Sequence, residues 1–356
     1  MFGKSLTCGK QVVLFGILVF MYLNISIPLF TLEKKEYNIF IVLDTIDMWS
    51  IGIREGFKKS LDESLSESGA SAVYTEFNTE VDPAKVSLII TAIKQGQPDL
   101  IICATYPDGF ADTNITLKLT DQKYSFISSN PIPIQTGIIK NMEKPGGNVT
   151  GIGVFLQQNS MIKLGKMINP KTKKILFVSW SAMPDVNAWY EIELKKACIQ
   201  EGVELASFKI VKNIEEEFAL LSEWDKKGPE YMALIGISAF VRRDGSPLDA
   251  NALEPVFIRE KLKHLNVLSY DDTMIKLGYV AGTCVFWNDI GAQMAEKGVR
   301  ILDGTKPGDL SWDYPRKYNI VLNLKAAKDK GLVFPQSLIE AAYRVYTDYN
   351  GNFLGK

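Results

Sequence analysis

The stretch KPGGNVTGIG, residues 144–153, lies near the middle of the chain and holds four glycines and one proline. A phosphate-binding P-loop would need a strand before the glycines and a Lys-Ser/Thr pair opening a helix after them. Here GIIKNMEK on the N-terminal side reads as a helix, and NVTGIGVF on the C-terminal side reads as a strand. We therefore interpret Gly146 and Gly147 as a helix end with a tight turn, and residues 148–153 as a hinge between two halves.

Strands and helices alternate on both sides of this stretch. Before it, NIFIVLD and PDLIICA read as strands, and Asp82 with Pro83 marks the start of a helix between them. After it the alternation restarts, with KKILFVSW, YMALIGIS and NVLSYDD as strands separated by helical segments. Such alternation indicates parallel sheets covered by helices on both faces. The predicted fold class is α/β, with two doubly wound parallel-sheet lobes.

The composition argues against several classes of function. Lysine and arginine number 40 against 41 aspartates and glutamates, so bulk charge favours no nucleic-acid partner. The single histidine, His264, lies in a charged segment, which leaves no multi-histidine metal site and no convincing catalytic triad. No G-x-S-x-G motif occurs. We therefore expect no enzymatic activity, no cofactor and no metal.

The four cysteines show no CxxC spacing, which argues against a zinc or redox motif. The alternatives are one disulfide or buried free thiols, and the apolar surroundings favour thiols.

Residues 1–31 carry the pattern of an export signal. Lys4 and Lys10 precede an apolar stretch at 12–30, the order typical of a signal peptide. The stretch is nearly long enough to span a bilayer, and NIS at 24–26 matches a cleavage site poorly, so an uncleaved membrane anchor is the alternative. Because the lysines would stay in the cytoplasm, both alternatives place the rest of the chain outside it, secreted or anchored.

Several motifs carry a resemblance to a known family. They are KPGGNVTGIG, REGFKKSL after the first strand, and the C-terminal stretches NDIGAQMAEKGVRILDGTKPGDL and KYNIVLNLKAAKDKGLVFPQSLIEAA. From about residue 37 to 346 the chain resembles the extracytoplasmic substrate-binding proteins of ABC importers with the type I periplasmic-binding fold. More narrowly, it resembles the group that includes tryptophan- and other aromatic amino-acid-binding proteins.

The resemblance implies three crossings between the lobes, at 148–153, near 282–286 and near 305–313. It divides the chain into lobe one, 37–150 and 287–305, and lobe two, 151–286 and 306–356. It also implies capture of a small, planar or aromatic ligand between the lobes and delivery to an ABC importer permease. The alternative is a ligand-sensing domain that signals to a membrane partner. Membrane contact, in either case, would be made through the N-terminal segment.

Ligands of open α/β sheets bind beyond the carboxyl ends of the strands, so the residues that follow each predicted strand are site candidates. Aromatic side chains are dense among them, as an apolar pocket with a few polar groups requires. The ligand-binding candidates are Thr45, Asp47, Trp49, Thr105, Tyr106, Ser129, Asn130, Phe155, Trp180, Ser181, Ser238, Tyr270, Asp271 and Phe286. Those expected to stack on the ligand are Trp49, Tyr106, Trp180 and Tyr270, with Thr105 and Asn130 as polar contacts.

The chain departs from the relatives' pattern at two positions. Relatives that bind amino acids commonly carry an acidic residue where Asn130 stands and an aspartate where Phe286 stands. Because a carboxylate is the natural partner of an ammonium group, these departures argue against an α-amino-acid ligand. Other aspartates that could compensate are Asp47, Asp108, Asp271 and Asp272.

Overall fold

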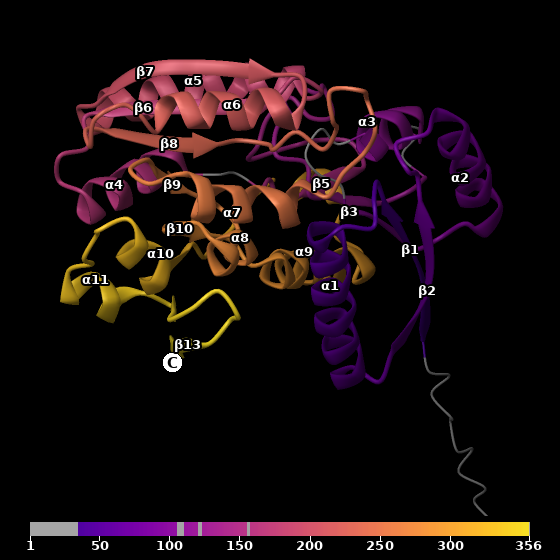
Figure 1. Cartoon of the computed structure of the whole chain (residues 1–356). Coiled ribbons are helices and arrows are strands. Elements are labelled where there is room, and N and C mark those ends of the chain that lie inside the picture. The colour runs from indigo at the N-terminus through magenta and orange to yellow at the C-terminus, as the bar shows by residue number, and fades with distance from the viewer. Residues whose placement is uncertain (1–34, 105–109, 120–122, 155–156, 356) are drawn as a thin grey trace, which may run out of the picture. The chain divides into compact units, whose positions relative to one another are not determined.

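The computed structural model describes residues 35–104, 110–119, 123–154 and 157–355, which form two α/β sheet systems (Figure 1). The first sheet has five strands in the order β2-β1-β3-β4-β5, all paired in parallel. Its strands are β1 Glu36–Leu43, β2 Ser71–Asn78, β3 Leu100–Ala104, β4 Phe126–Ser128 and β5 Val149–Gly151. The continuous apolar runs of β1 and β3 are almost wholly buried, as expected for strands covered on both faces.

Helices cover both faces of the first sheet. Side chains of β1 alternate between the faces, so Ile41 packs with α1 and α9 while Val42 packs with α2 and α3. These helices are α1 Met48–Glu67, α2 Pro83–Gly96, α3 Phe110–Ile115 and α9 Trp287–Leu302, and a short 3-10 helix, η1, covers Thr116–Leu119. The predicted start of α2 is confirmed, because Asp82 accepts a hydrogen bond from the Ala84 backbone N–H with Pro83 in the first turn.

The second sheet has eight strands in the order β13-β12-β11-β10-β9-β8-β6-β7. Strands β6 to β10 pair in parallel, whereas β10 pairs antiparallel with β11 and β12 with β13. The strands are β6 Lys174–Trp180, β7 Glu204–Val211, β8 Tyr231–Ile235, β9 Asn266–Leu268, β10 Ala281–Cys284, β11 Asn319–Asn323, β12 Arg344–Tyr346 and β13 Phe353–Gly355. The predicted α/β class with two parallel-sheet lobes is confirmed.

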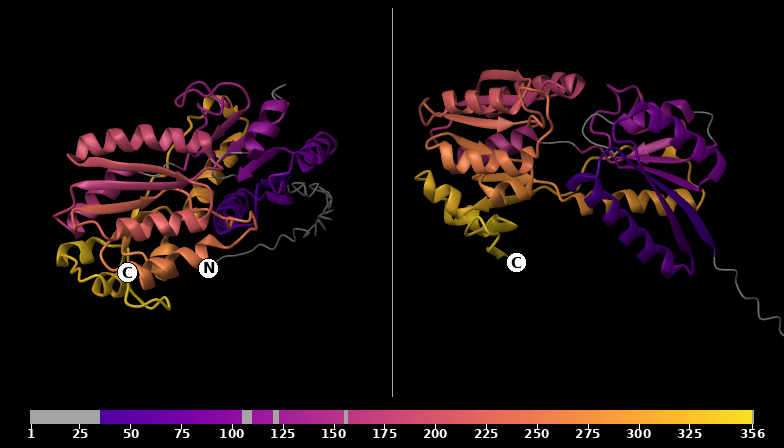
Figure 2. Two further views of the ribbon diagram at one scale, coloured as in Figure 1. Left: turned by 45° about the horizontal axis from the view of Figure 1, so that its top comes forward. Right: turned by 45° about the vertical axis from the view of Figure 1, so that its right-hand side comes forward.

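Helices also cover both faces of the second sheet (Figure 2). One face packs against α4 Gln158–Ile168 and α5 Pro184–Glu201, and the other against α6 Ile214–Trp224, α7 Ala250–Lys261 and α8 Asp272–Leu277. The remaining helices are α10 Leu324–Asp329, α11 Gln336–Ala341 and the 3-10 helix η2 Pro307–Asp309. The chain thus reaches α9 from β10 of the second sheet, and it returns through η2 to β11.

The central glycine stretch differs in part from the prediction. Gly146 and Gly147 have φ values of 68° and 67°, so the tight turn is confirmed, and β5 is the predicted strand. Residues 137–144, predicted as a helix, instead form bends and irregular loop. The Asn141 side chain accepts hydrogen bonds from the backbone N–H groups of Glu143 and Lys144, which competes with helical bonding.

The prediction of buried free thiols is confirmed for the three described cysteines. Cys103, Cys198 and Cys284 are buried free thiols, and burial raises the pKa of the Cys198 thiol to about 11. His264 is exposed. Among the described helices none combines the length and apolar content needed to cross a membrane, and the predicted signal or anchor at 1–31 lies outside the described residues.

Candidate functional site

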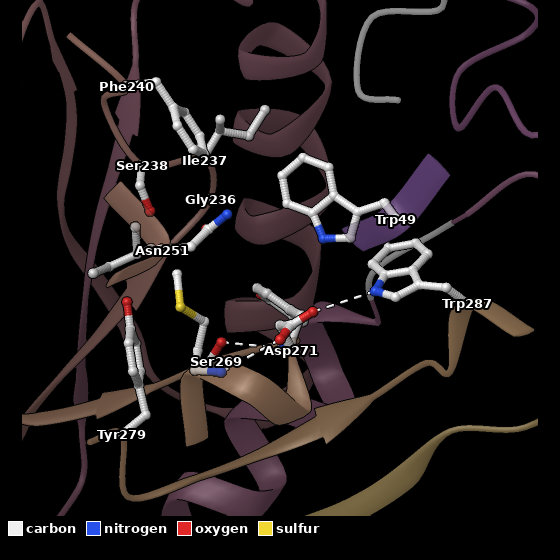
Figure 3. Close-up of a pocket in the computed structure, with 13 residues that line it drawn as sticks. Trp49, Gly236, Ile237, Ser238, Phe240, Asn251, Ser269, Asp271, Tyr279 and Trp287 are labelled. Atoms are coloured by element: carbon white, nitrogen blue, oxygen red, sulfur yellow. Dashed lines mark hydrogen bonds between the residues drawn. The ribbon is translucent and has the colours of Figure 1, made fainter. Parts of the chain in front are cut away.

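Two adjoining cavities lie beyond the carboxyl ends of β6, β8 and β9 and beside the start of α1. Their volumes are about 500 Å³ and about 60 Å³. The residues that line both are Trp49, Ile237, Phe240 and Asn251. Those that line the larger cavity alone include Asp44, Thr45, Asp47, Trp180 and Met183. Those that line the smaller one alone include Ser238, Tyr270, Asp271, Met274, Tyr279 and Trp287 (Figure 3).

The start of α1 brings Trp49 to both cavities. Asp47 caps this helix, because its Oδ1 accepts hydrogen bonds from the N–H groups of Trp49 and Ser50 at 2.9 Å and 2.8 Å. The hydroxyl of Thr45 donates to the other carboxylate oxygen of Asp47. The Trp49 ring then lies 6.0 Å from the Trp287 ring, centre to centre, at 60° (Figure 3). Two tryptophans from distant parts of the sequence thus form one aromatic wall.

The ends of β6 and β8 supply a second aromatic wall. Trp180 ends β6, and its indole N–H donates to the Lys212 carbonyl at 3.2 Å. Its ring lies 6.1 Å from that of Phe240 at 55°. Phe240 follows Ile237, whose backbone N–H donates to the Ser179 hydroxyl at 3.1 Å. Trp180 and Phe240 thus pack together beyond the ends of the neighbouring strands β6 and β8.

The residues after β9 carry the polar groups of the smaller cavity. Asp271 caps α8 through hydrogen bonds from the N–H groups of Thr273 and Met274. The Trp287 indole N–H donates to its other carboxylate oxygen at 3.3 Å (Figure 3). The neighbouring Tyr270 is buried, and its hydroxyl donates to the Gln158 side-chain oxygen at 2.5 Å. Charge and aromatic surface are thus in direct contact at Asp271.

A pair of buried glutamates supports the loop that carries Ser238 and Phe240. Glu217 on α6 accepts a hydrogen bond from the Ala239 backbone N–H at 3.0 Å, and Glu254 on α7 contacts both Glu217 and the Ser238 side chain. Both carboxyl groups are 0% exposed. Burial raises the pKa of each, and the charge of Glu254 raises the pKa of Glu217 further. The pair therefore retains a proton at a pH where ordinary carboxyl groups are ionised.

The structure brings seven of the sequence-derived candidates to the two cavities. Four line the larger one or both: Thr45, Asp47, Trp49 and Trp180. Three line the smaller one: Ser238, Tyr270 and Asp271. Three further candidates, Thr105, Tyr106 and Phe155, lie outside the described residues.

Four candidates lie elsewhere. Asn130 is buried, and its side-chain oxygen accepts from the Ile132 backbone N–H at 2.8 Å, so its amide holds its own loop. Ser129 is buried beside the Cys103 carbonyl, and Ser181 is exposed without lining either cavity. Phe286 lines a separate cavity of about 370 Å³, where its ring packs 5.0 Å from that of Tyr343.

Some lining residues were not among the candidates. Trp287 follows Phe286 directly and could have been found as an aromatic residue at a predicted crossing. Ile237 and Phe240 follow β8, in the region that sequence reasoning pointed to. Asn251 and Tyr279 carry no such signal, because one lies in the first turn of a helix and the other in a loop before β10.

Across the part of the chain that the structure describes, no three His, Cys, Asp or Glu side chains are grouped so that they could hold a metal ion. The lining of the two cavities is mainly aromatic and apolar, with carboxylate, hydroxyl and amide groups between the rings. Such a lining can bind and orient an organic molecule.

A family model described as ABC transporter substrate binding protein matches residues 49–346. The chain belongs to this family. The resemblance predicted from the sequence motifs is therefore confirmed. Members of the family are substrate-binding proteins of ABC transporters, which work outside the cytoplasm when they serve importers.

Individual relatives are similar over most of the chain. A tyrosine-binding protein from Clostridioides difficile (strain R20291) is 21% identical over 273 residues, which cover 76% of this chain and 74% of that protein. The structure of the ABC domain in complex with L-Trp from Streptococcus pneumonia has a TM-score of 0.70 and 20% identity, covering 87% and 100% of the two chains. The ligand-free, open structure of a substrate-binding protein with adhesive properties from Clostridium difficile has a TM-score of 0.69 and 19% identity. The match covers 88% of this chain and 99% of that one. At these identities the solved structures establish a shared fold.

Proposed function

We propose that this substrate-binding protein captures a small planar or aromatic molecule in the two adjoining cavities and delivers it to an ABC importer permease. One observation carries the proposal. Trp49, Trp180 and Phe240 line a space of about 500 Å³, and Trp287 extends the Trp49 wall into the adjoining cavity of about 60 Å³. Small-molecule sites typically measure about 300–1,000 Å³ and are lined by aromatic and apolar side chains.

The relatives support a ring-bearing ligand. One is named for tyrosine, and another was solved with L-Trp. A flat ring would stack against tryptophan or phenylalanine, an arrangement that contributes about 0.5–1.5 kcal/mol beyond the burial of area. The protein would act by binding alone, without a catalysed reaction.

Capture would use two lobes that close about a hinge. We place lobe one at 37–150 and 287–305, and lobe two at 151–286 and 306–356. Two neighbouring hinge segments support these boundaries, because Ile152 forms a β-bridge with Asp313 and the Gly153 backbone N–H donates to the Asp313 carbonyl at 2.7 Å. A ligand that binds both lobes would shift the population towards the closed form.

Export would be directed by residues 1–31, as a cleaved signal or an anchor. A reporter enzyme that is active only outside the cytoplasm, fused after Lys356, should then be active in cells that express the full chain. Activity of a matching cytoplasm-only reporter would contradict export.

The central experiment identifies the bound molecule. Protein purified under native conditions is denatured, and the released small molecules are analysed by mass spectrometry. A ring compound that rebinds to stripped protein with micromolar or better affinity supports the proposal. Release and rebinding of a compound without a ring, such as a sugar, would overturn it.

A further inference from the structure

The walls of the site are acidic although the chain as a whole is nearly neutral. Four neighbouring cavities surround the start of α1, and the described residues that line them include one basic residue, Arg344. The acidic ones are Asp44, Asp47, Asp249, Asp271, Asp272 and Asp289. The whole chain, by contrast, has a formal net charge of −1. The negative charge is therefore a local property of the site.

The guanidinium that lines the outermost of these cavities is already engaged. Arg344 forms an ion pair with Asp272, and its guanidinium packs over the Phe286 ring at 5.7 Å. It lines the outer cavity of about 370 Å³, and Trp287 and Asp271 lie between that cavity and the smaller ligand cavity because they line both. No lysine, arginine or histidine is among the described residues that line the two ligand cavities. A ligand carboxylate would therefore meet no positive side chain there.

Two of the carboxylates are not neutralised by an ion pair. No ion pair between described residues includes Asp47 or Asp271. Each caps a helix, and a helix N-terminus offsets only about half a unit of negative charge. Because α8 has only six residues, its contribution at Asp271 is smaller still. Both sites retain a net negative field.

The smaller cavity also offers a polar group without a partner. Tyr279 is 1% exposed and lines this cavity, and its hydroxyl makes no hydrogen bond to another described residue. In Figure 3 the hydroxyl lies on the opposite side of the cavity from Trp49 and Trp287. At about 60 Å³ this cavity is much smaller than the adjoining one of about 500 Å³, so it suits the smaller part of a ligand.

We propose that the ligand is an organic cation, whose ammonium group enters the smaller cavity between Asp271, the Trp49–Trp287 wall and the Tyr279 hydroxyl. The ring would occupy the larger cavity, so this inference rests on the proposed capture of a ring compound. A cation is attracted to the face of tryptophan and bonds strongly to a carboxylate. The acidic surroundings would also increase the association rate of a cation at low ionic strength.

The test keeps the ring constant and varies the charge. Calorimetry compares tryptamine, L-tryptophan and indole-3-acetate, which are a cation, a zwitterion and an anion, and then tyramine, L-tyrosine and 4-hydroxyphenylacetate. The amine of at least one series should bind about tenfold or more tighter than its zwitterion, and the anion should bind weakest. A zwitterion or anion that binds as tightly as its amine overturns the inference but leaves the proposed function standing. Absence of binding in both series counts against the capture of such ring compounds and overturns the inference with it.

A matched pair of variants tests whether the Asp271 carboxylate binds the ammonium group of the ligand. Asp271→Asn keeps an N-cap of nearly equal quality and removes the negative charge. It should weaken amine binding about tenfold and change the binding of neutral indole little. Asp82→Asn makes the same change at the exposed cap of α2 and should alter neither affinity. Thermal melts of both variants separate charge loss from unfolding. Equal loss of amine and indole binding in a folded Asp271→Asn protein would overturn the assignment.

Discussion

Trp180 lines the larger cavity and also packs against the core. It ends a buried strand, but its ring is only partly buried and packs on Phe240 at the larger cavity. Trp180→Ala should therefore weaken ligand binding by at least about tenfold, because an aromatic contact and its buried area contribute about 1.5 kcal/mol or more. Calorimetry with the released ligand measures the change.

The control for this prediction is another partly buried tryptophan of the same sheet system. Trp189 on α5 packs on Tyr190 and lines neither cavity. Trp189→Ala should leave affinity unchanged while lowering the melting temperature. Unchanged affinity in Trp180→Ala would mean that its ring serves only to support Phe240.

The buried carboxyl pair Glu217 and Glu254 should make stability depend on pH. Because burial raises the pKa of both above the ordinary glutamate value of 4.5, the folded state binds more protons than the unfolded state. The stabilisation that this pair contributes is therefore fully present below the ordinary glutamate pKa. It is lost as pH rises through the raised pKa of the folded state. Glu217→Gln keeps an acceptor for the Ala239 N–H and removes one of the two acids.

The measurement is thermal unfolding at a series of pH values that starts below 4.5, the ordinary glutamate value, and rises into the alkaline range. Glu217→Gln should gain stability relative to wild type as pH rises. Glu223→Gln, at an exposed position of the same helix, should follow the wild-type curve. If melting temperature changes with pH in the same way for wild type and Glu217→Gln, ionisation of the pair does not reduce stability, and the prediction is wrong.

At the scale of elements, the packing of α9 on α1 depends on glycine. A Cβ atom at Gly291 would lie 2.1 Å from the Ile53 carbonyl oxygen, and one at Gly56 would lie 2.1 Å from the Asn288 carbonyl oxygen. The two helix backbones therefore approach too closely for any side chain at these points. This contact joins residues more than 230 positions apart in the sequence.

Gly291→Ala should destabilise the fold by about 1–3 kcal/mol, because the added methyl group meets backbone that cannot move aside. Gly298→Ala on the same helix is the matched control, since its nearest neighbour is a Leu100 side-chain atom at 3.3 Å. Alanine is more favourable than glycine in a helix by about 1 kcal/mol. This gain should offset the slightly close contact and leave Gly298→Ala near wild-type stability. Denaturant unfolding distinguishes them, and equal stability of the two variants would contradict the close crossing.

At the scale of the molecule, the segment that follows α9 is hydrogen-bonded to that helix at Ser311 and Asp313. Lys297 is 7% exposed, and its Nζ donates to the Ser311 carbonyl and to the Asp313 carboxylate, both at 2.7 Å. Burial lowers the pKa of the Lys297 amine, while Asp313 opposes this shift. The contact stabilises the position from which the chain returns to β11 of the second sheet.

Lys297→Met should cost about 1–3 kcal/mol, because two hydrogen bonds to a charged group are lost in a largely buried place. Lys58 provides the comparison, since its ion pair with Glu76 is about one third exposed on both sides. Lys58→Met should cost less than about 1 kcal/mol. A loss of stability in Lys297→Met no larger than in Lys58→Met would show that the buried amine does not hold this segment.

The sequence alone determined the class of fold and the family. Strand and helix periods are local properties, so the alternation that predicts parallel sheets, the Asp82–Pro83 helix start and the turn at Gly146 and Gly147 could all be read from short stretches. The motifs around residues 144–153 and near the C-terminus indicated the family. The rule that ligands bind beyond strand ends also selected Trp49 and Trp180, which line the larger cavity.

The tertiary structure decided which of those strand-end residues meet. Asn130 bonds to its own loop at Ile132, whereas Phe286 packs against Tyr343 and Arg344 from a distant part of the chain. Trp287 reaches Trp49 only through the close crossing of α1 and α9. Periodicity records whether a residue is buried but not against what, since that depends on the shapes of surfaces far apart in sequence. The acidic character of the site follows from the same assembly of distant loops.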